Sequence, residues 1–488
     1  MGRIVRNLTI ELDPRSPRPP YLKVADAVIA AIEAGRLKPG SRLPGTRALA
    51  KVLGLNRNTV DAGYQEAVAQ GWLVAEPSRG TFVARNLPDM GVGSPAVVEA
   101  NPQLNGSRTE ESAKSLLSFS DGAADPRLLP TAAMARAFRR GLIRKKAPSS
   151  LGYDDPRGTT ALRHALREHL AAERGLSFAS HDLMVTRGSQ MALFLAAQAI
   201  AIPGMAVAVE NPGYPLAVTA FRAAGVRVVP IEVDEGGMSI DGLEGALARD
   251  LSIRAVYVTP HHQYPTTVTM GASRRLRLID LARTARLTIL EDDYDHDYRF
   301  EGAPVLPIAA RAPGETVYIG SLSKLLAPGI RLGYVVAPPD LVSRMAVIRE
   351  AIDRQGDGPL EEAVALMIED SELARHARKA RRIYHARRDY LAARLRSALP
   401  GALAFDIPRG GLALWARIVD GTDPERWSKV ASELGLSLTP AAQHSIDGLG
   451  PAAFRLGYAG LDELEIDRAA ELLERAHAAA RSGEQFAN

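Results

Sequence analysis

The segment Ser321-Leu322-Ser323-Lys324 brings an amine and two hydroxyls together, and Arg331 stands eight positions after Ser323. A lysine amine forms an imine with an aldehyde, while hydroxyls and a guanidinium bind a phosphate dianion. A lone lysine after a strand is usually a surface charge, but this combination and spacing are far more specific. The segment predicts that Lys324 is the Schiff-base lysine for a phosphorylated aldehyde, with Ser321, Ser323 and Arg331 at the phosphate.

A second motif, Glu291-Asp292-Asp293-Tyr294, ends an expected strand about thirty residues earlier. A carboxylate at Asp292 can keep a pyridine nitrogen protonated, so that the ring withdraws electrons, and Tyr294 can bond the ring hydroxyl. A metal site is the alternative, because hard ligands crowd this stretch: Asp292, Asp293, Asp295, His296 and Asp297. The later Ser-x-Ser-Lys segment favours the cofactor interpretation, and the cofactor that needs all these groups is pyridoxal phosphate.

Two further elements suit a cofactor site of this kind. Gly188-Ser189-Gln190 follows an expected strand and opens a helix, and the N–H groups of a helix N-terminus bind phosphate well. The tripeptide by itself is a weak signal. Tyr214 comes just after the next strand and can stack on the pyridine ring, although a tyrosine at a turn can equally belong to a core.

The elements that position these residues alternate between strands and helices from about Leu116 onward. This rhythm predicts an α/β fold with a mainly parallel, seven-stranded sheet. The expected strands are Leu183–Thr186, Ala206–Glu210, Val226–Val233, Ala255–Thr259, Leu287–Asp292, Thr316–Gly320 and Gly333–Ala337. A long charged helical region follows at about 360–398, and the last ninety or so residues predict a small C-terminal α+β subdomain.

Composition limits the classes of site. The chain has 488 residues, 46% of them hydrophobic and 24% charged, which is ordinary for folded domains. It has no Cys, which excludes disulfides, thiolate metal sites and a Cys nucleophile. The most apolar stretch, Met191–Val209, is broken by Gln198 and Pro203-Gly204, so we expect no membrane span. We also expect no signal peptide and a cytoplasmic location.

Residues 1–85 form a basic module, with 13 Lys/Arg against 7 Asp/Glu, whereas the rest of the chain is near neutral. Such a module either binds a polyanion, nucleic acid above all, or presents a solvated surface. Its pattern predicts three helices, Pro20–Gly35, Pro44–Leu53 and Asn56 to about Gly71, followed by two short strands around a turn at Glu76–Gly80. This is the pattern of a winged helix-turn-helix. We expect a linker at 86–115, rich in Gly, Pro, Asn and Ser, and a second domain at 116–488.

In a winged helix-turn-helix, the N-terminal residues of the third helix reach base edges in the major groove. Arg57 and Asn58 suit guanine and adenine respectively, and Thr59 stands beside them. Arg47, on the second helix, suits a phosphate, and Arg79, at the wing tip, suits the minor groove or a phosphate. An exposed arginine alone is usually only a solvent-facing charge, but the position of Arg57 in a basic module favours a DNA contact.

Residues 19–85 resemble the GntR family of bacterial DNA-binding domains. The resemblance lies in PPYLKVADAVIAAIEAGRLKPGSRLPGTRALAKVLGLNRNTV and GWLVAEPSRGTFVA. The DNA contacts that it implies are Arg47, Arg57, Asn58, Arg79 and Gly80. Many members carry a basic residue where this chain has Asp61, so the resemblance does not supply a phosphate contact there.

Residues from about Phe119 to Ala479 resemble fold type I aminotransferases, and more closely the aminotransferase-like half of the MocR/GabR regulators. The motifs are LGYDDPRG, ENPGYP, TPHHQYPTT, EDDYDHDYRF, SLSKLLAPGIRLGYVVAP and FRLGYAG. The resemblance implies an internal aldimine on Lys324, a pyridine carboxylate at Asp292, an O3′ contact at Tyr294, stacking on Tyr214, and phosphate contacts from Ser189, Gln190, Ser321, Ser323 and Arg331. It also implies that Tyr153 reaches the cofactor of a partner subunit and that Arg455 holds an amino-acid carboxylate.

The chain departs from this pattern at two places. The Asn-Pro-x-Asn-Pro motif of working aminotransferases is replaced by TPHHQYPTT, which leaves His262 or Gln263 near the ring hydroxyl. Pro215 follows Tyr214, so an additional effector-binding side chain known just past this tyrosine in relatives is not expected here.

We therefore expect a bacterial transcriptional regulator. Its winged helix binds double-stranded operator DNA, and its homodimeric body binds pyridoxal phosphate and senses a small amine, an amino acid or pyridoxal phosphate itself. One alternative is an active aminotransferase that carries a DNA-binding head, against which the replaced Asn and the appended head both count. The other is a DNA-binding scaffold with a vestigial body, against which the intact set of Ser-x-Ser-Lys, Asp292 and Arg331 counts.

Overall fold

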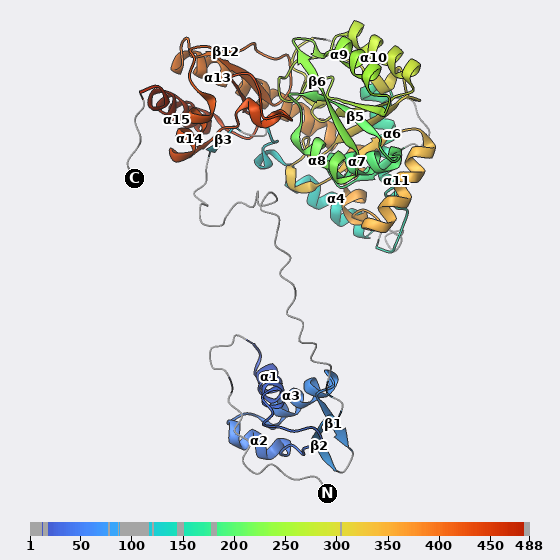
Figure 1. The fold of residues 1–488 in the computed structure, drawn as a ribbon, viewed down its shortest axis with the longest axis vertical. Coiled ribbons are helices and arrows are strands. Elements are labelled where there is room, and N and C mark those ends of the chain that lie inside the picture. The colour runs from blue at the N-terminus through green and yellow to red at the C-terminus, as the bar shows by residue number, and fades with distance from the viewer. Residues whose placement is uncertain are drawn as a thin grey trace. The chain divides into compact units, whose positions relative to one another are not determined.

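The computed structural model describes residues 12, 18–76, 79–85, 87, 117–119, 122–143, 151–176, 183–302 and 305–482. The chain divides into two compact units, Met1–Glu110 and Glu111–Asn488, and each is described by itself (Figure 1). The expected linker at 86–115 lies outside the described residues, apart from Leu87. Within the described ranges, no helix is both long enough and apolar enough to cross a membrane.

The smaller unit consists of three helices and a two-stranded antiparallel hairpin, which confirms the predicted winged helix-turn-helix. The elements are α1 (Pro20–Glu33), α2 (Thr46–Leu53), α3 (Arg57–Ala69), β1 (Leu73–Glu76) and β2 (Gly80–Val83). Val28 and Tyr64 are buried in its core. Gly54 ends α2 in the left-handed region, and the Asn56 side chain accepts a hydrogen bond from the Asn58 backbone N–H at the start of α3.

The larger unit is built on an eight-stranded sheet of order β4-β11-β10-β9-β8-β5-β6-β7. Its strands are β4 (Leu183–Thr186), β5 (Ala206–Asn211), β6 (Arg227–Asp234), β7 (Gly237–Met238), β8 (Ile253–Val258), β9 (Thr288–Asp293), β10 (Thr316–Ser321) and β11 (Gly333–Val336). All seven predicted strands are present, and the sheet gains the two-residue β7 at its edge. Only β7 and β11 run antiparallel to their neighbours, so the sheet is mainly parallel, as predicted.

Helices cover both faces of this sheet (Figure 1). One face packs on α7 (Gly188–Ile200), α8 (Pro215–Ala223) and α11 (Pro339–Ile352), through strand residues such as Val209 and Val335. The other face packs on α9 (Ile240–Arg249) and α10 (Ala272–Ala285) beneath β5 and β8, and on α6 (Thr160–Arg174) and α12 (Gly358–Glu369) beneath β4 and β11. α4 (Thr131–Ile143) in turn packs against α12. Strands buried on both faces explain the continuous apolar runs in the sequence.

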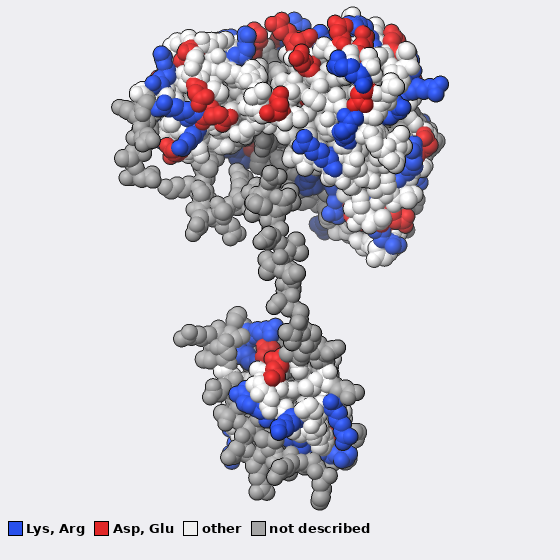
Figure 2. All heavy atoms as spheres, viewed as in Figure 1, with Lys and Arg blue, Asp and Glu red and all other residues white. Residues whose placement is uncertain are grey.

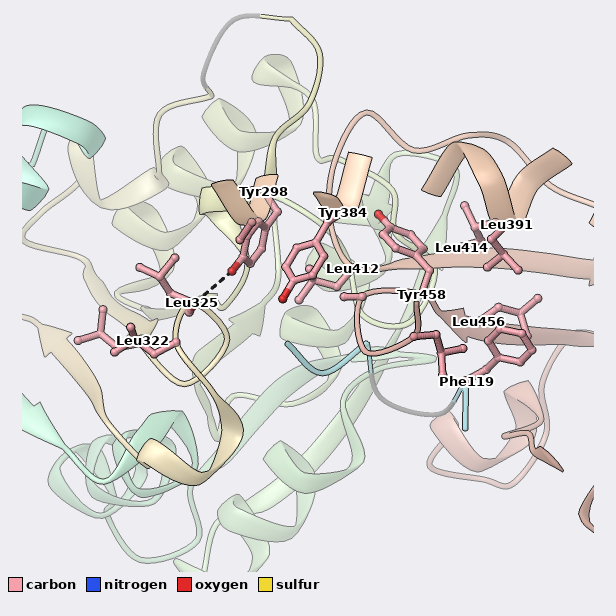
Figure 3. Close-up of a cluster of buried hydrophobic side chains, with 14 of the residues drawn as sticks. Phe119, Tyr298, Leu322, Leu325, Tyr384, Leu391, Leu412, Leu414, Leu456 and Tyr458 are labelled. Atoms are coloured by element: carbon pink, nitrogen blue, oxygen red, sulfur yellow. Dashed lines mark hydrogen bonds between the residues drawn. The ribbon is translucent and has the colours of Figure 1, made fainter. Parts of the chain in front are cut away.

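The C-terminal part is an α+β subdomain, as predicted. It contains the three-stranded antiparallel sheet β12 (Leu403–Ala404), β13 (Ala413–Ile418) and β15 (Ala453–Gly457), with α13 (Glu372–Ala398), α14 (Pro424–Glu433) and α15 (Glu463–Ser482). β14 (Leu436–Ser437) pairs with β3 (Leu117–Ser118). Phe119, Tyr298, Tyr384 and Leu456 belong to one buried cluster, so a single core joins the subdomain to the rest of this unit (Figure 3).

Candidate functional site

Parallel strands deliver their carboxyl ends to the same edge of a sheet, and ligands bind in the crevice outside that edge. Here β4, β5, β8, β9 and β10 lead into one cleft. Its lining residues are Ser189, Tyr214, Tyr257, Thr259, Tyr264, Asp292, Tyr294 and Lys324. Five of these eight residues were predicted from the sequence, and Tyr257, Thr259 and Tyr264 were not.

Asp292 is the buried carboxylate of the cleft, with 3% of its surface exposed. Its Oδ2 accepts a hydrogen bond of 2.9 Å from the Tyr257 hydroxyl, whereas its buried Oδ1 has no hydrogen-bond partner among the described residues. Burial raises the pKa of Asp292 to about 7. A protonated ring nitrogen would supply both the missing donor and the missing positive charge, so this carboxylate fits a pyridinium cofactor.

Lys324 lines the same cleft, and its Nζ lies 3.4 Å from the carbonyl oxygen of Gly122. Hydrogen bonds from a buried tyrosine fix the backbone that carries Lys324. The buried Tyr298 hydroxyl donates to the carbonyl oxygens of Lys324, at 3.0 Å, and of Leu325, at 3.3 Å (Figure 3). The lysine side chain therefore projects from a fixed loop into the cleft that also contains Asp292.

The predicted phosphate-binding residues gather at the N-terminus of α7. Gly188 has a φ of 75°, and a Cβ at this position would lie 3.0 Å from Nη2 of Arg331, so the Arg331 guanidinium packs directly on the glycine. Ser321 pairs with Gly333, whose Cα also packs on Gly188. Ser323 accepts a hydrogen bond of 3.2 Å from the backbone N–H of Leu332. The arrangement joins helix N–H groups, a guanidinium and hydroxyls, as a phosphate requires.

Gln190 and Arg331 also line a surface hollow beside this helix end. The Gln190 amide nitrogen donates to the Leu216 carbonyl oxygen at 2.7 Å, while its buried Oε1 is without a partner among the described residues. Gln190 therefore lines this hollow rather than the cleft, and Ser189 is the residue of this turn that lines the cleft itself.

The segment TPHHQYPTT places Tyr264 in the cleft, whereas His262 and Gln263 are not among the residues that line it. His262 turns its Nδ1 to the buried Asp295 carboxylate at 2.7 Å. Gln263 donates its amide to the carbonyl oxygens of Pro212 and Tyr264. Both side chains therefore hold the loop, and the placement of His262 or Gln263 near the ring hydroxyl stays a prediction.

Tyr294 lies at the cleft with its hydroxyl donated to the carbonyl oxygen of His262 at 2.9 Å. Burial raises its pKa well above the usual range, so the phenol keeps its proton at neutral pH. Tyr214, at the start of α8, meets Tyr264 edge to face with ring centroids 5.1 Å apart. These aromatic rings form one wall of the cleft.

The carboxylates of the alternative metal site point in different directions. Asp293 pairs with Arg174 and accepts a hydrogen bond of 2.6 Å from the Tyr318 hydroxyl, whereas Asp295 pairs with His262 and Asp292 with Tyr257. In the part of the chain that the structure describes, no three His, Asp or Glu side chains are grouped as metal ligands. The Glu291–Asp297 stretch thus supplies one cleft-lining carboxylate and several internal ion pairs.

Arg455 lies on β15 behind the aromatic wall, with only 1% of its surface exposed. Its guanidinium sits 4.5 Å from the ring centroid of Tyr264, and its Nη1 donates to the Pro265 carbonyl oxygen at 3.0 Å. Its Nε has no hydrogen-bond partner among the described residues. Tyr153, by contrast, is 80% exposed, and the Arg354 guanidinium lies 3.9 Å from the centroid of its ring.

The smaller unit exposes Arg47, Arg57, Asn58 and Arg79, while Thr59 is half-buried. Arg79 forms an ion pair of 2.6 Å with Glu76. A Cβ at Gly80 would lie 3.2 Å from Nε of Arg42, so a further basic residue, not predicted from the sequence, lies beside the wing. Lys and Arg side chains outnumber acidic ones on the visible face of this unit (Figure 2). This surface is suited to a polyanion.

Two family models match the chain. The model of bacterial regulatory proteins of the gntR family matches residues 20–83, and the model of aminotransferase class I and II matches residues 116–473. The probable rhizopine catabolism regulatory protein MocR of Rhizobium meliloti is 30% identical over 463 residues, which cover 92% of each chain. The HTH-type transcriptional regulator TauR of Rhodobacter capsulatus is 30% identical over 431 residues, which cover 83% of this chain and 85% of TauR.

Solved structures match the larger unit. The crystal structure of a Pyrococcus horikoshii kynurenine aminotransferase gives a TM-score of 0.71 at 27% identity, and covers 79% of this chain and 98% of that one. Together with the cleft that pairs Lys324 with a buried Asp292, this identifies the cofactor as pyridoxal 5′-phosphate. The chain thus belongs to the MocR-type transcriptional regulators, in which a GntR-family winged helix that binds operator DNA is joined to an aminotransferase class I and II domain.

Proposed function

We propose that this regulator senses a small amine in the cleft of its aminotransferase-like domain and changes its hold on operator DNA in response. The proposal rests on the buried Asp292, whose Oδ1 receives no hydrogen bond from the residues that the structure describes and which lines the same cleft as Lys324. When bound, pyridoxal phosphate supplies an aldehyde that takes up amines and a ring that withdraws electrons. Lys324 would hold the aldehyde until an incoming amine displaces its Nζ.

The remaining groups of the cleft would fix the cofactor in place. Asp292 would accept from the pyridine nitrogen, Tyr294 would bond the ring hydroxyl, and Tyr214 would stack on the ring. The phosphate would lie at the N-terminus of α7, where the supporting contacts are those of Arg331 and Gly188. Its proposed ligands are Gly188, Ser189, Gln190, Ser321, Ser323 and Arg331.

An amino acid is the effector that the cleft supports best, because Arg455 lies within 4.5 Å of a ring that lines it. A guanidinium binds a carboxylate with two parallel hydrogen bonds, and this pairing is stronger in a site shielded from water. The second candidate effector is pyridoxal phosphate itself, for which occupancy of the cleft would be the signal. Binding can shift the body between conformations only by its differential affinity for them.

We propose DNA contacts for the winged helix as well. Arg57, Asn58 and Thr59 would read base edges, and Arg47 and the wing residues Arg79 and Gly80 would bind the backbone or minor groove. The domain boundaries proposed are 1–85 for the winged helix, 86–115 for the linker and 116–488 for the body. A DNA-binding regulator of this kind would act in the cytoplasm.

The body would act as a homodimer, in which Tyr153 reaches the cofactor of the partner subunit. The support for this is the 80% exposure of Tyr153, together with the exposed Leu151 in the same loop. Such apolar side chains are costly to leave in water and typical of surfaces that are covered in an assembly. A symmetric dimer would also match an operator with two half-sites.

The test is to add candidate amines to the cofactor-loaded protein while measuring its visible absorption band and its operator affinity in the same samples. The proposal predicts that one class of amine changes both signals over the same concentration range. An amine that changes the band fully while operator affinity stays constant would refute sensing. The alternative is an active aminotransferase, supported by the complete set of Lys324, Asp292 and Tyr294 in one cleft; multiple-turnover amino transfer would establish it.

A further inference from the structure

His444 is a buried histidine whose ring has no hydrogen-bond partner in the described ranges. It ends the short 3-10 helix η8 (Ala441–His444) and is 6% exposed, and both Nδ1 and Nε2 are buried and unpaired. An imidazole always carries at least one N–H donor, so this burial leaves a strong polar group unsatisfied. Neither the family motifs nor the proposed cofactor contacts account for it.

The position of His444 is fixed against the cleft. Its carbonyl oxygen accepts a hydrogen bond of 2.8 Å from the backbone N–H of Gly213, the residue before the cleft-lining Tyr214. The next residues continue this contact, since the Ile446 N–H donates to the Asn211 side chain at 3.0 Å. The turn that carries His444 is therefore attached to the loop that follows β5.

Two side chains that carry nitrogen atoms unpaired among the described residues flank one aromatic ring. The His444 ring meets Tyr264 edge to face, with centroids 5.3 Å apart, and the Arg455 guanidinium lies 4.5 Å from the centroid of the same ring. Arg455 also has its Nε unpaired among the described residues. Three buried nitrogen atoms that lack a partner among the described residues thus belong to the two side chains beside Tyr264, which itself lines the cleft.

We propose that His444 and Arg455 together form the acid-binding subsite of the effector, and that the ring of Tyr264 covers this subsite in the present structure. The inference rests on the proposed sensing function and deepens it, because it names a second effector-binding residue and a chemical class, an amine that bears one carboxylate. Arg455 supplies the positive charge, and His444 donates one N–H to a carboxylate oxygen. The acid group takes the place of the Tyr264 ring between them.

The protonation state of His444 suits this role. Burial, and then the nearby charge of Arg455, lower its pKa to about 4, so the ring is neutral at pH 7. A neutral imidazole beside one guanidinium gives the subsite a single positive charge. The subsite therefore matches a monocarboxylate, and selects it over an uncharged group of the same size.

The experiment compares L-alanine with ethylamine, which share an amine but differ in the carboxylate. Each is added to the cofactor-loaded protein, and half-saturation is measured from the visible band. Wild type should bind alanine more tightly than ethylamine. His444→Phe should weaken the binding of alanine by about tenfold, as expected for a lost hydrogen bond to a charged group. The affinity for ethylamine should change by less than about twofold. Gln443→Ala, a change at the exposed neighbouring residue, is the matched control and should alter neither.

The outcomes separate the subsite from sensing. Equal binding of the two amines by wild type, or an unchanged alanine preference in His444→Phe, would overturn the subsite. A lost preference with operator affinity that never responds to alanine would keep the subsite and refute sensing. If His444→Phe does not hold the cofactor, His444→Gln and His444→Leu decide instead, since only the glutamine keeps a donor; equal alanine affinity in these two variants would overturn the proposal.

Discussion

Replacing Asp292 by Asn removes a buried negative charge that lowers the stability of the cofactor-free protein. Burial raises the pKa of this carboxyl from 3.8 to about 7. Since one pKa unit corresponds to about 1.4 kcal/mol, the ionised form is disfavoured by about 4 kcal/mol. A carboxyl whose pKa is raised on folding does not lower the free energy of unfolding at a pH below its unfolded pKa. Above that pH the loss of stability grows until the pH reaches the folded pKa.

The expected effect therefore depends on pH in a defined direction. The charge costs about 2 kcal/mol at a pH of about 5.5 and about 4 kcal/mol at a pH of about 8. Asn can still accept the hydrogen bond from Tyr257, so cofactor-free Asp292→Asn should be stabilised relative to wild type, by about 2 kcal/mol more at the higher pH. The loaded protein should respond in the opposite sense, because Asn cannot pair with a protonated pyridine ring.

The assay is urea unfolding of the cofactor-free wild type and variant at both pH values, with a spectroscopic titration of pyridoxal phosphate on each. Asp406→Asn, at an exposed position, is the control and should change neither measurement. A stability difference that is the same at both pH values would refute the assignment of the raised pKa to Asp292. Unchanged cofactor affinity in Asp292→Asn would refute its role at the pyridine nitrogen.

Three further predictions test the other parts of the molecule. Lys324→Ala should lose the visible band formed with pyridoxal phosphate while its far-ultraviolet circular dichroism stays the same, and a wild type that never forms a band would contradict the assignment. Arg57→Ala should weaken operator binding by about 1–3 kcal/mol and relax the preference for one base. Arg47→Ala should weaken binding to all DNA sequences alike and lower the slope of log affinity against log salt concentration by about one. Titration of labelled DNA measures both effects. Arg455→Ala should keep the band and the DNA binding seen without effector but lose the response to carboxylate-bearing amines, and a wild-type response in this variant would exclude Arg455 as the anchor.

The strands of the larger unit could be predicted because their burial on both faces imposes continuous apolar runs. β5 and β8 illustrate this, since each is buried along nearly its whole length. The two-residue β7 could not be predicted, because so short a segment has no periodicity. The helical region near 360–398 divides into α12 and α13, separated where Ser371 takes a φ of 59°, and nothing in the residue type of Ser371 signals that conformation.

The cleft-lining residues could be predicted where they lie at or just after the carboxyl end of a strand, because the strand fixes where the chain enters the cleft. Asp292, near the end of β9, and Lys324, just after β10, are of this kind, and both line the cleft. Side-chain directions in the loop after β8 could not be predicted in this way, because a loop lacks the alternation of inward and outward side chains that a strand has. There Tyr264 enters the cleft, while His262 is drawn away by Asp295.

The buried polar atoms in and beside the cleft count against the alternative in which the body is a scaffold that binds no ligand. A buried donor or acceptor without a partner costs about 1–3 kcal/mol, and an apolar replacement of similar shape removes that cost. A body that binds nothing would therefore gain stability by losing such groups. Instead, Asp292, His444 and Arg455, which lie in or beside one cleft, have buried atoms that are unpaired among the described residues. Their cost is offset when a group in the cleft supplies a donor to Asp292 and acceptors to the other two, which is what a pyridinium ring and an acid-bearing amine would do together.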